Sequence, residues 1–252
     1  MDMFSLEGKC ALVTGAAQGL GQGYALVLAQ AGARVAILDV SSQTEAIARE
    51  MAGDTLEIFG ICCNLLDRNS LKEGFQKAVE ALGGLDILIN NAGIQVRGKA
   101  EEIELSAWDR LIELNLTATF EMCQLAAKQM LVQGRGGKIV NVASMLSFFG
   151  GLNCCPYAAS KGAVAQLTKA LSNEWAGQGI NVNAIAPGYM DTPLNTKLRA
   201  IPERDAEITA RIPAHRWGLP EDLMGTIIYL CSRASDYVCG TVIPVDGGYL
   251  GR

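Results

Sequence analysis

Tyr157 and Lys161, four positions apart, form the residue pair with the clearest chemical use in this chain. On a helix such a pair lies on one face, with Cβ atoms roughly 5–6 Å apart, so the ammonium group can lie beside the phenol. A tyrosine with an ordinary pKa near 10 is a poor acid or base at neutral pH, and a neighbouring cation lowers that pKa. Ser144 precedes the pair and can offer a hydroxyl to the same substrate oxygen. These three residues predict a site that moves a proton on an alcohol or carbonyl oxygen.

A glycine-rich stretch near the start of the chain has the spacing Gly15-x-x-x-Gly19-x-Gly21 and includes Gln18 and Leu20. Glycines let the backbone approach a pyrophosphate, and the N-terminus of a following helix attracts its charge. The alternative is a tight strand-to-helix turn that binds nothing, which is at least as frequent for an isolated glycine cluster. Because the stretch lies between an apolar run and a helical pattern, we favour a dinucleotide-binding turn.

Asp39 closes the second apolar run, about 20 residues beyond the glycine stretch. A carboxylate there can accept hydrogen bonds from the adenosine ribose hydroxyls and would repel a 2′-phosphate. No arginine or lysine occurs in residues 40–43. The sequence therefore favours NAD(H) over NADP(H), with a surface carboxylate at a strand end as the alternative.

These residues lie among alternating apolar runs and amphipathic patterns. Short aliphatic or β-branched runs predict strands at 10–14, 34–39, 58–63, 85–90, 138–143, 181–186 and 241–245. Longer patterns predict helices at 19–31, 44–51, 70–82, 106–133, 157–178 and 220–232. Continuous apolar strands separated by helices imply a parallel sheet covered on both faces, so we expect a doubly wound α/β fold. In such sheets ligands bind beyond the carboxyl ends of the strands.

Composition narrows the class of protein. The 252 residues are 50% hydrophobic and 19% charged, which is enough apolar material for one continuous core, so we expect a single domain. A net charge of -5 without a basic block argues against a nucleic-acid partner, and one histidine argues against a metal site. No apolar run is long enough to span a bilayer and no leader is recognisable. We expect a cytoplasmic protein, not bound to a membrane, that binds small molecules.

Taken in order, the motifs resemble those of the short-chain dehydrogenase/reductase family over essentially the whole chain. Each motif alone has an ordinary explanation, but their joint occurrence in this order is improbable by chance. They are Thr14-Gly15-x-x-x-Gly19-x-Gly21, Asn90-Asn91-Ala92-Gly93, Asn115, Ser144, Tyr157-x-x-x-Lys161 and Pro187-Gly188. The resemblance implies one Rossmann-like catalytic domain over residues 1–252 that transfers a hydride between NAD and a CH–OH group.

The resemblance also implies a role for each catalytic residue. Tyr157 would be the general acid or base, and Ser144 would orient and polarise the carbonyl. Lys161 would hold the nicotinamide ribose and depress the pKa of the tyrosine. Asn115 would anchor a water molecule that links Lys161 to a proton relay.

The cofactor contacts implied by the resemblance follow the ends of the strands. One position departs from the family pattern, because Asn64-Leu65 stands where the family usually has an aspartate near the adenine, although an amide can still bond the adenine. The full set is Gly15, Gln18, Gly19, Leu20, Gly21, Asp39, Asn64, Leu65, Asn91, Ala92, Gly93, Tyr157, Lys161, Pro187, Gly188 and Thr192.

Within the family, the nearest resemblance is to enzymes of sugar acids. A carboxylate substrate needs compensation on desolvation, and a guanidinium offers it in bidentate form. Arg97 and Arg216 are the candidates, with a solvated surface arginine as the alternative for each, while Ser144 and Leu146 would also contact the substrate. A neutral polyol or cyclic ketone is the alternative substrate, and a dinucleotide-binding sensor without turnover is the alternative outside enzymes.

The resemblance implies two further features. The polar segment at about residues 192–217 would form a mobile lid over the substrate, and lid closure would exclude water from hydride transfer. The chain would assemble as a homotetramer through the long predicted helices at 106–133 and 157–178. Periodicity alone does not establish that number of subunits.

Overall fold

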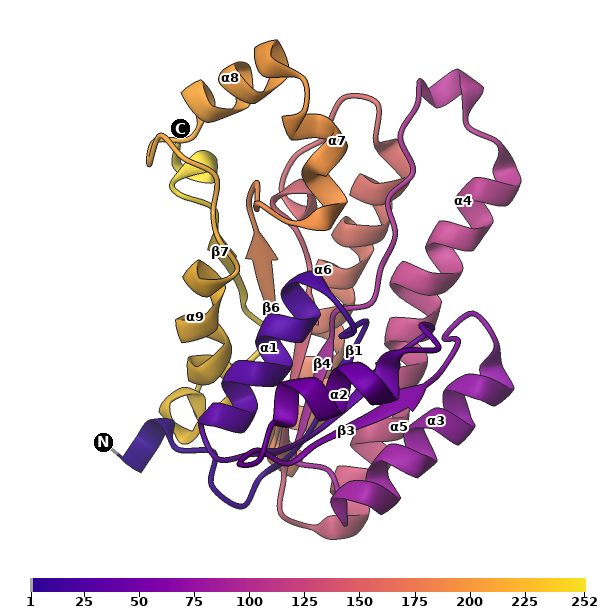
Figure 1. The fold of residues 1–252 in the computed structure, drawn as a ribbon, viewed down its shortest axis with the longest axis vertical. Coiled ribbons are helices and arrows are strands. Elements are labelled where there is room, and N and C mark those ends of the chain that lie inside the picture. The colour runs from indigo at the N-terminus through magenta and orange to yellow at the C-terminus, as the bar shows by residue number, and fades with distance from the viewer. Residues whose placement is uncertain (1) are drawn as a thin grey trace.

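The computed structural model describes the backbone of residues 2–252 and their side chains other than those of Asp2, Leu194 and Lys197. Within this part of the chain, seven parallel strands form one sheet in the order β3-β2-β1-β4-β5-β6-β7 (Figure 1). The order reverses between the neighbours β1 and β4, which confirms the doubly wound α/β fold. The strands are β1 (Cys10–Thr14), β2 (Arg34–Asp39), β3 (Ile58–Cys62), β4 (Ile87–Asn90), β5 (Gly137–Val142), β6 (Ile180–Pro187) and β7 (Val242–Val245).

Helices cover both faces of the sheet. One buried cluster joins the sheet to α1 and α9, and a second joins it to α3, α5 and the end of α6. The α-helices are α1 (Gly19–Gln30), α2 (Thr44–Ala52), α3 (Arg68–Leu82), α4 (Leu105–Ile112), α5 (Ala118–Gln133), α6 (Cys155–Trp175), α7 (Thr196–Arg199), α8 (Pro202–Arg211) and α9 (Glu221–Cys231).

The strand β1 shows why the sheet is buried on both faces. Successive side chains of a strand point to opposite faces. Ala11 and Val13 belong to the cluster with α1 and α9, whereas Cys10 and Leu12 belong to the cluster with α3 and α5. All four side chains are buried. A strand that is apolar at every position therefore requires a layer of helices on each side.

Two predicted helices differ from the observed ones for local reasons. The helix predicted from residue 70 begins at Arg68, because the carboxylate of Asp67 accepts from the amides of Asn69 and Ser70 and so caps an earlier start. The continuous helix predicted at 106–133 is instead α4 and α5 with a π-helical turn between them at Glu113–Thr117.

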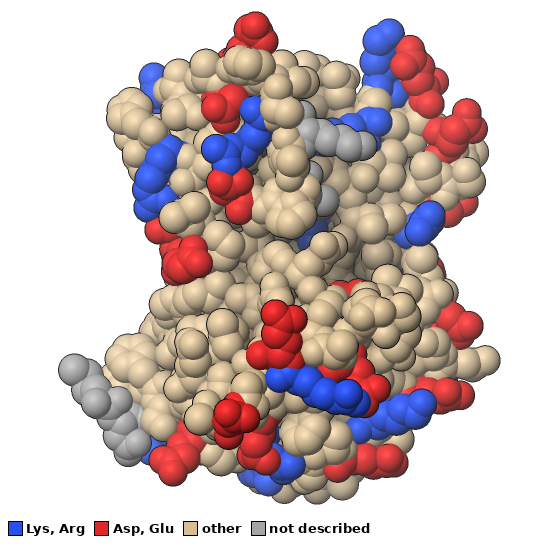
Figure 2. All heavy atoms as spheres, viewed as in Figure 1, with Lys and Arg blue, Asp and Glu red and all other residues tan. Residues whose placement is uncertain are grey.

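The segment from residue 192 to residue 217 carries α7 and α8, which the sequence did not predict as helices. Ile208 and Ile212 anchor it in a small buried cluster with Met145, Trp217 and Tyr249. Figure 2 shows the molecule narrowing at mid-height, between the part that carries this segment and the part that carries α1 and α2. None of the helices in the described chain has the length and apolar character that a membrane crossing needs.

Candidate active site

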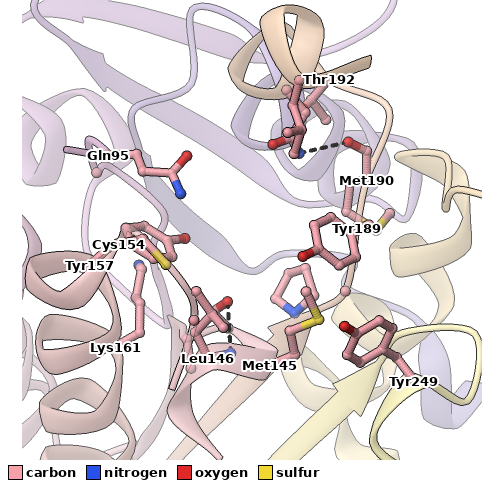
Figure 3. A pocket seen from close by; sticks show the side chains of 18 of the residues that line it. Gln95, Met145, Leu146, Cys154, Tyr157, Lys161, Tyr189, Met190, Thr192 and Tyr249 are labelled. Carbon is pink, nitrogen blue, oxygen red and sulfur yellow. Dashed lines mark hydrogen bonds between the residues drawn. The ribbon is translucent and has the colours of Figure 1, made fainter. Parts of the chain in front are cut away.

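The loops after β1, β4, β5 and β6 meet at one edge of the sheet, because the strands are parallel and adjacent. A cavity of about 360 Å³ opens there (Figure 3). Its lining comes from Leu20 of α1, from the loop after β4, and from the ends of β5 and β6 with the loops that follow them, together with residues of α6, α7 and α8 and Tyr249 near the C-terminus. This is where a doubly wound sheet places a ligand.

The glycine turn is shaped by the end of β4. Gly15 has φ +63°, and a Cβ there would lie 2.7 Å from Cα of Ala92. A Cβ at Gly21 would lie 2.3 Å from the carbonyl oxygen of Gly15. Both positions therefore need glycine because backbone packs against backbone. Gly19 also has a positive φ, +60°, but a Cβ there would meet only Pro193, at 3.9 Å, so the space beside it is open.

Asn91 fastens this turn to the sheet. Its Nδ2 atom donates to the carbonyl oxygens of Thr14 at 3.0 Å and Gly15 at 2.8 Å. In return, Oγ1 of Thr14 accepts from the amides of Asn91 and Ala92, each at 3.1 Å. Asn91 thus holds the glycine turn in shape as well as lining the cavity.

Asp39 ends β2 beside the same turn. Its carboxylate accepts from the amide of Ala17 at 3.0 Å and from the amide of Ser41 at 3.1 Å. These two bonds fix the carboxylate between the glycine turn and the loop that follows β2. It is therefore placed at the edge where an adenosine ribose would lie beside the turn.

Tyr157 and Lys161 lie on one face of α6, as their spacing predicts. The Nζ atom of Lys161 lies 5.6 Å from the centroid of the Tyr157 ring and donates to the carbonyl oxygen of Val142 at 2.6 Å. Burial lowers the pKa of Lys161 to about 8. Pro156 in the first turn of α6 and the packing of this helix on β6 set the direction of the pair.

The pKa of Tyr157 departs from the expectation. Burial of the phenol raises it to about 12, and this effect outweighs the neighbours that favour the phenolate. Those neighbours are Ser144, by hydrogen bonding, and Arg97, by its charge. Lys161 was expected to lower this pKa, but its own charge is disfavoured by burial and its ammonium group is directed to a backbone carbonyl.

Ser144 lies two residues beyond the end of β5 and is buried at 8% exposure. Its Oγ atom accepts from the amide of Leu146 at 3.2 Å, while Oγ of Ser147 accepts from the amide of Ser144 at 3.3 Å. This capping arrangement starts the short 3₁₀ turn Met145–Ser147 and fixes the hydroxyl at the cavity wall.

Asn115 lies in the π-helical turn rather than at the cavity surface. Its Oδ1 accepts from the amide of Ile94 at 2.9 Å, and its Nδ2 donates to the carbonyl of Ile94 at 3.0 Å and to Oγ of Ser160 at 3.2 Å. The side chain therefore joins the loop after β4 to α6. Single π turns inside α-helices are frequent at functional sites.

Most predicted site residues come together at this edge, though not all line the cavity. Asn64 and Leu65 follow β3 at the same edge of the sheet, where the amide of Leu66 donates to Oδ1 of Asn64. The predicted residues that line the cavity are Leu20, Asn91, Gly93, Arg97, Ser144, Leu146, Tyr157, Lys161, Pro187, Gly188 and Thr192.

Arg216 is not where a substrate clamp requires it. It does not line the cavity but forms a bidentate pair with Asp222 at the start of α9, at 2.6 and 2.8 Å. This pair lowers the pKa of Asp222 to about 2. The prediction of Arg216 as a substrate residue is corrected because α9 supplies a nearer carboxylate partner, which the sequence pattern did not reveal.

Other polar residues of the cavity were missed by the sequence reasoning. Arg204 and Arg211 come from α8, and Gln95, Tyr189 and Tyr249 come from three different loops. A signal existed only for α8, where residues 204, 208 and 211 have the spacing of one helix face. The loop residues carry no periodicity, so only the folded chain brings them together.

A doubly wound sheet with a glycine turn at its switch point and a Ser-Tyr-Lys set beside it defines a nicotinamide-dependent oxidoreductase. The family model described as enoyl-(acyl carrier protein) reductase matches residues 15–250. The chain belongs to the short-chain dehydrogenase/reductase family.

The proteins similar to this chain include two dehydrogenases that are named for a sugar acid. The 2-dehydro-3-deoxy-D-gluconate 5-dehydrogenase of Escherichia coli strain K12 is 49% identical over 252 residues, which covers 100% of this chain and 99% of the enzyme. The enzyme of the same name from Dickeya dadantii strain 3937 is 47% identical with the same coverage. The crystal structure of a gluconate 5-dehydrogenase from Burkholderia cenocepacia J2315, in complex with NADP and tartrate, has a TM-score of 0.96 at 36% identity and covers 100% of this chain and 98% of its own.

Proposed function

We propose that this protein is an NAD-dependent dehydrogenase of hydroxy or keto sugar acids, with the activity of a 2-dehydro-3-deoxy-D-gluconate 5-dehydrogenase. The observation that carries the proposal is a cavity in which the Tyr157–Lys161 pair shares its walls with arginines. The arginines are Arg97, Arg204 and Arg211. The full-length likeness to the two sugar-acid enzymes supports the substrate class.

The chain's own residues fit a dinucleotide at the glycine turn. The first turn of α1 has no acidic residue, and among the described side chains none caps its amide groups. These amides and the helix dipole are therefore left to attract an anion such as a pyrophosphate. The open space beside Gly19 admits the ligand, while the crowded Gly15 and Gly21 keep the backbone close to it.

A bound nicotinamide supplies the exchange of a hydride with the substrate carbon. Tyr157 then takes the hydroxyl proton when the alcohol is oxidised and returns it when the ketone is reduced. The Ser144 hydroxyl donates to the same oxygen and holds it beside the phenol. Lys161 holds the ribose, and Asn115 keeps the loop at Ile94 in place behind it. In oxidation the alcohol loses both a hydride and a proton, and in reduction the ketone gains both, so atoms and electrons balance.

NAD is the proposed cofactor because of Asp39. A carboxylate fixed beside the turn accepts the ribose hydroxyls and repels a 2′-phosphate. The Burkholderia cenocepacia enzyme was crystallised with NADP, so the family includes proteins that bind the phosphorylated form. Asp39 is the residue on which this choice depends.

The carboxylate of the substrate is the reason for the arginines. Three guanidinium groups around one cavity favour an anion over a neutral polyol or a cyclic ketone. The second candidate function is that of a gluconate 5-dehydrogenase, which the likeness to the Burkholderia cenocepacia structure favours. A dinucleotide-binding sensor without turnover is the candidate outside enzymes, and the complete Ser-Tyr-Lys set speaks against it.

The test is a steady-state assay that follows the absorbance of the reduced nicotinamide. NAD⁺ and NADP⁺ are each tested with gluconate, 2-deoxygluconate, 2-keto-3-deoxygluconate and a panel of neutral polyols, with Tyr157→Phe as the control. Turnover with NAD⁺ and the acids that depends on Tyr157 is expected. Turnover of neutral alcohols alone would overturn the substrate class and keep the dehydrogenase, whereas no turnover with any of them would favour the sensor.

Two features expected from the family resemblance stay predictions. The segment at residues 192–217, which carries α7 and α8, would be a lid whose closure excludes water. The homotetramer is checked by light scattering of the purified protein.

A further inference from the structure

The helix α8 presents two arginines to the cavity on the same face as its buried anchor. Arg204, Ile208 and Arg211 are spaced i, i+4 and i+7, which places them in one stripe along a helix. Ile208 is 3% exposed and packs in the buried cluster with Met145, Trp217 and Tyr249. Both arginines line the cavity. Burial of Ile208 therefore brings both arginines to the cavity, where Arg204 is half-buried and Arg211 stays open to solvent.

Arg211 is held in place by an aromatic side chain from the far end of the chain. Its guanidinium carbon lies 4.9 Å from the centroid of the Tyr249 ring. Tyr249 in turn lies 5.7 Å from Phe149, in a stacked arrangement, and 5.6 Å from Tyr189, edge to face. A guanidinium stacked on a fixed ring loses little freedom when it binds an anion. Arg211 is thus preorganised in the cavity wall.

The three arginines of the cavity differ in their partners. Arg204 is paired with Glu207 on its own helix. Among the described side chains, Arg211 and Arg97 form no ion pair with a carboxylate. The charge of Arg97 favours the phenolates of both Tyr157 and Tyr189 by lowering their pKa values, although burial raises both pKa values overall.

Tyr249 and Tyr157 stand on opposite sides of the cavity. Figure 3 shows Tyr157 with Lys161 and Cys154 on one side, and Tyr249 beneath Tyr189 on the other. Because Arg211 stacks on Tyr249, it belongs to the side away from the proton-transfer residue. A ligand that reached both residues would have to span the cavity.

We propose that Arg211 is the residue that binds the substrate carboxylate, so that the acid group lies at the end of the substrate remote from the carbon that is oxidised. This inference rests on the proposed function and deepens it. It identifies the substrate class as acids whose reacting hydroxyl is separated from the carboxylate by several carbons, and it excludes oxidation of a hydroxyl on the carbon next to the carboxylate. Because Arg211 belongs to α8, its contact with the carboxylate also joins the segment at residues 192–217 to the substrate.

The test compares Arg211→Gln and Arg211→Lys with Arg49→Gln, which removes a surface arginine of α2 that pairs with Glu45. Steady-state kinetics with D-gluconate are expected to show KM raised roughly 10- to 100-fold in Arg211→Gln, with a smaller change in kcat. Arg211→Lys should recover part of the loss, and Arg49→Gln should match the wild type. An unchanged KM in Arg211→Gln would overturn the inference.

A binding measurement separates recognition from folding. In a Tyr157→Phe background, calorimetry of D-gluconate with the cofactor-saturated protein should show the same loss for Arg211→Gln, while the Kd of the cofactor alone stays unchanged. A rise in both dissociation constants would indicate a structural role and overturn the assignment. The wild-type product, identified by NMR, should carry its ketone at a carbon not adjacent to the carboxylate, and oxidation at the adjacent carbon would overturn it too.

The two proposals fail in different ways. If the wild type turns over neutral polyols and no acid, the proposed sugar-acid function is wrong. If it turns over gluconate and Arg211→Gln behaves as the wild type does, only the role of Arg211 is wrong.

Discussion

Asn91 and Gly15 join the end of β4 to the glycine turn, through a 2.8 Å hydrogen bond from Nδ2 of the asparagine to the carbonyl oxygen of the glycine. The two segments can approach this closely only because Gly15 has no Cβ, since a Cβ there would collide with the backbone of Ala92. The cofactor turn and the loop that lines the cavity are therefore one rigid unit. A change on either side of this contact should disturb the binding of the dinucleotide.

Gly15→Ala tests this unit against Gly134→Ala. Both glycines have positive φ, +63° and +68°, but nothing lies within 4 Å of a Cβ at Gly134. Each alanine should cost about 1–2 kcal/mol of stability from the left-handed backbone. Only Gly15→Ala should also raise the Kd of the cofactor, by about tenfold or more, as measured by quenching of protein fluorescence. Equal cofactor affinity in the two variants would contradict the proposed role of the turn.

Asp39→Asn should weaken the preference for NAD⁺. The substitution keeps the size of the side chain and removes the charge that repels a 2′-phosphate. We expect the ratio of kcat/KM for NAD⁺ to that for NADP⁺ to fall by about tenfold or more, on the scale of hydrogen bonds to charged groups. The same assay on the wild type gives the ratio with which the variant is compared. A wild-type preference for NADP⁺ would refute the assignment of NAD.

Tyr157 should stay protonated well into the alkaline range in the protein without cofactor. Its pKa is raised to about 12, so the phenol form persists as the pH rises past the ordinary value of about 10. The difference in ultraviolet phenolate absorption between the wild type and Tyr157→Phe should therefore show no phenolate below about pH 10. A phenolate that forms near neutral pH would contradict the dominant effect of burial.

The pH dependence of activity should follow the protonation of Tyr157. Oxidation of the alcohol uses the phenolate as base and should become faster as the pH rises, whereas ketone reduction uses the phenol and should not. Tyr157→Phe should lower kcat about 10²- to 10⁴-fold in both directions. A rate of oxidation that falls between neutral pH and pH 9 would be inconsistent with Tyr157 as the base.

Arg97→Gln and Arg216→Gln should differ although both remove one positive charge. Arg97 lines the cavity and its charge favours the Tyr157 phenolate, so its loss should move the pH profile for oxidation to higher pH. Arg216 is paired with Asp222 outside the cavity, so its loss should leave the profile and the KM for acids within about twofold of the wild type. Matching profiles for the two variants would mean that Arg97 does not act on the tyrosine.

The fold and the order of the motifs could be predicted from the sequence because they depend on local patterns. Apolar runs without alternation define strands buried on both faces, and this is what the two clusters around β1 show. The spacing of Tyr157 and Lys161 needs only one helix to bring them together. Glycine spacing likewise indicates the turn, since positive φ and close backbone contacts exclude other residues.

Tertiary structure alone decided which charges meet. The sequence pattern favoured Arg216 as much as Arg97 as a substrate residue. In the folded chain Arg216 pairs with Asp222 of α9, whereas Arg97 lines the cavity. Arg211 enters the site because Ile208 is buried and because Tyr249, near the other end of the chain, supplies a ring for it. The pKa of Tyr157 follows the same rule, since burial and the distances between charges exist only in the folded chain. Local pattern therefore determined the scaffold and the spacing of Ser144, Tyr157 and Lys161, whereas the packing of distant segments decided the charges around them.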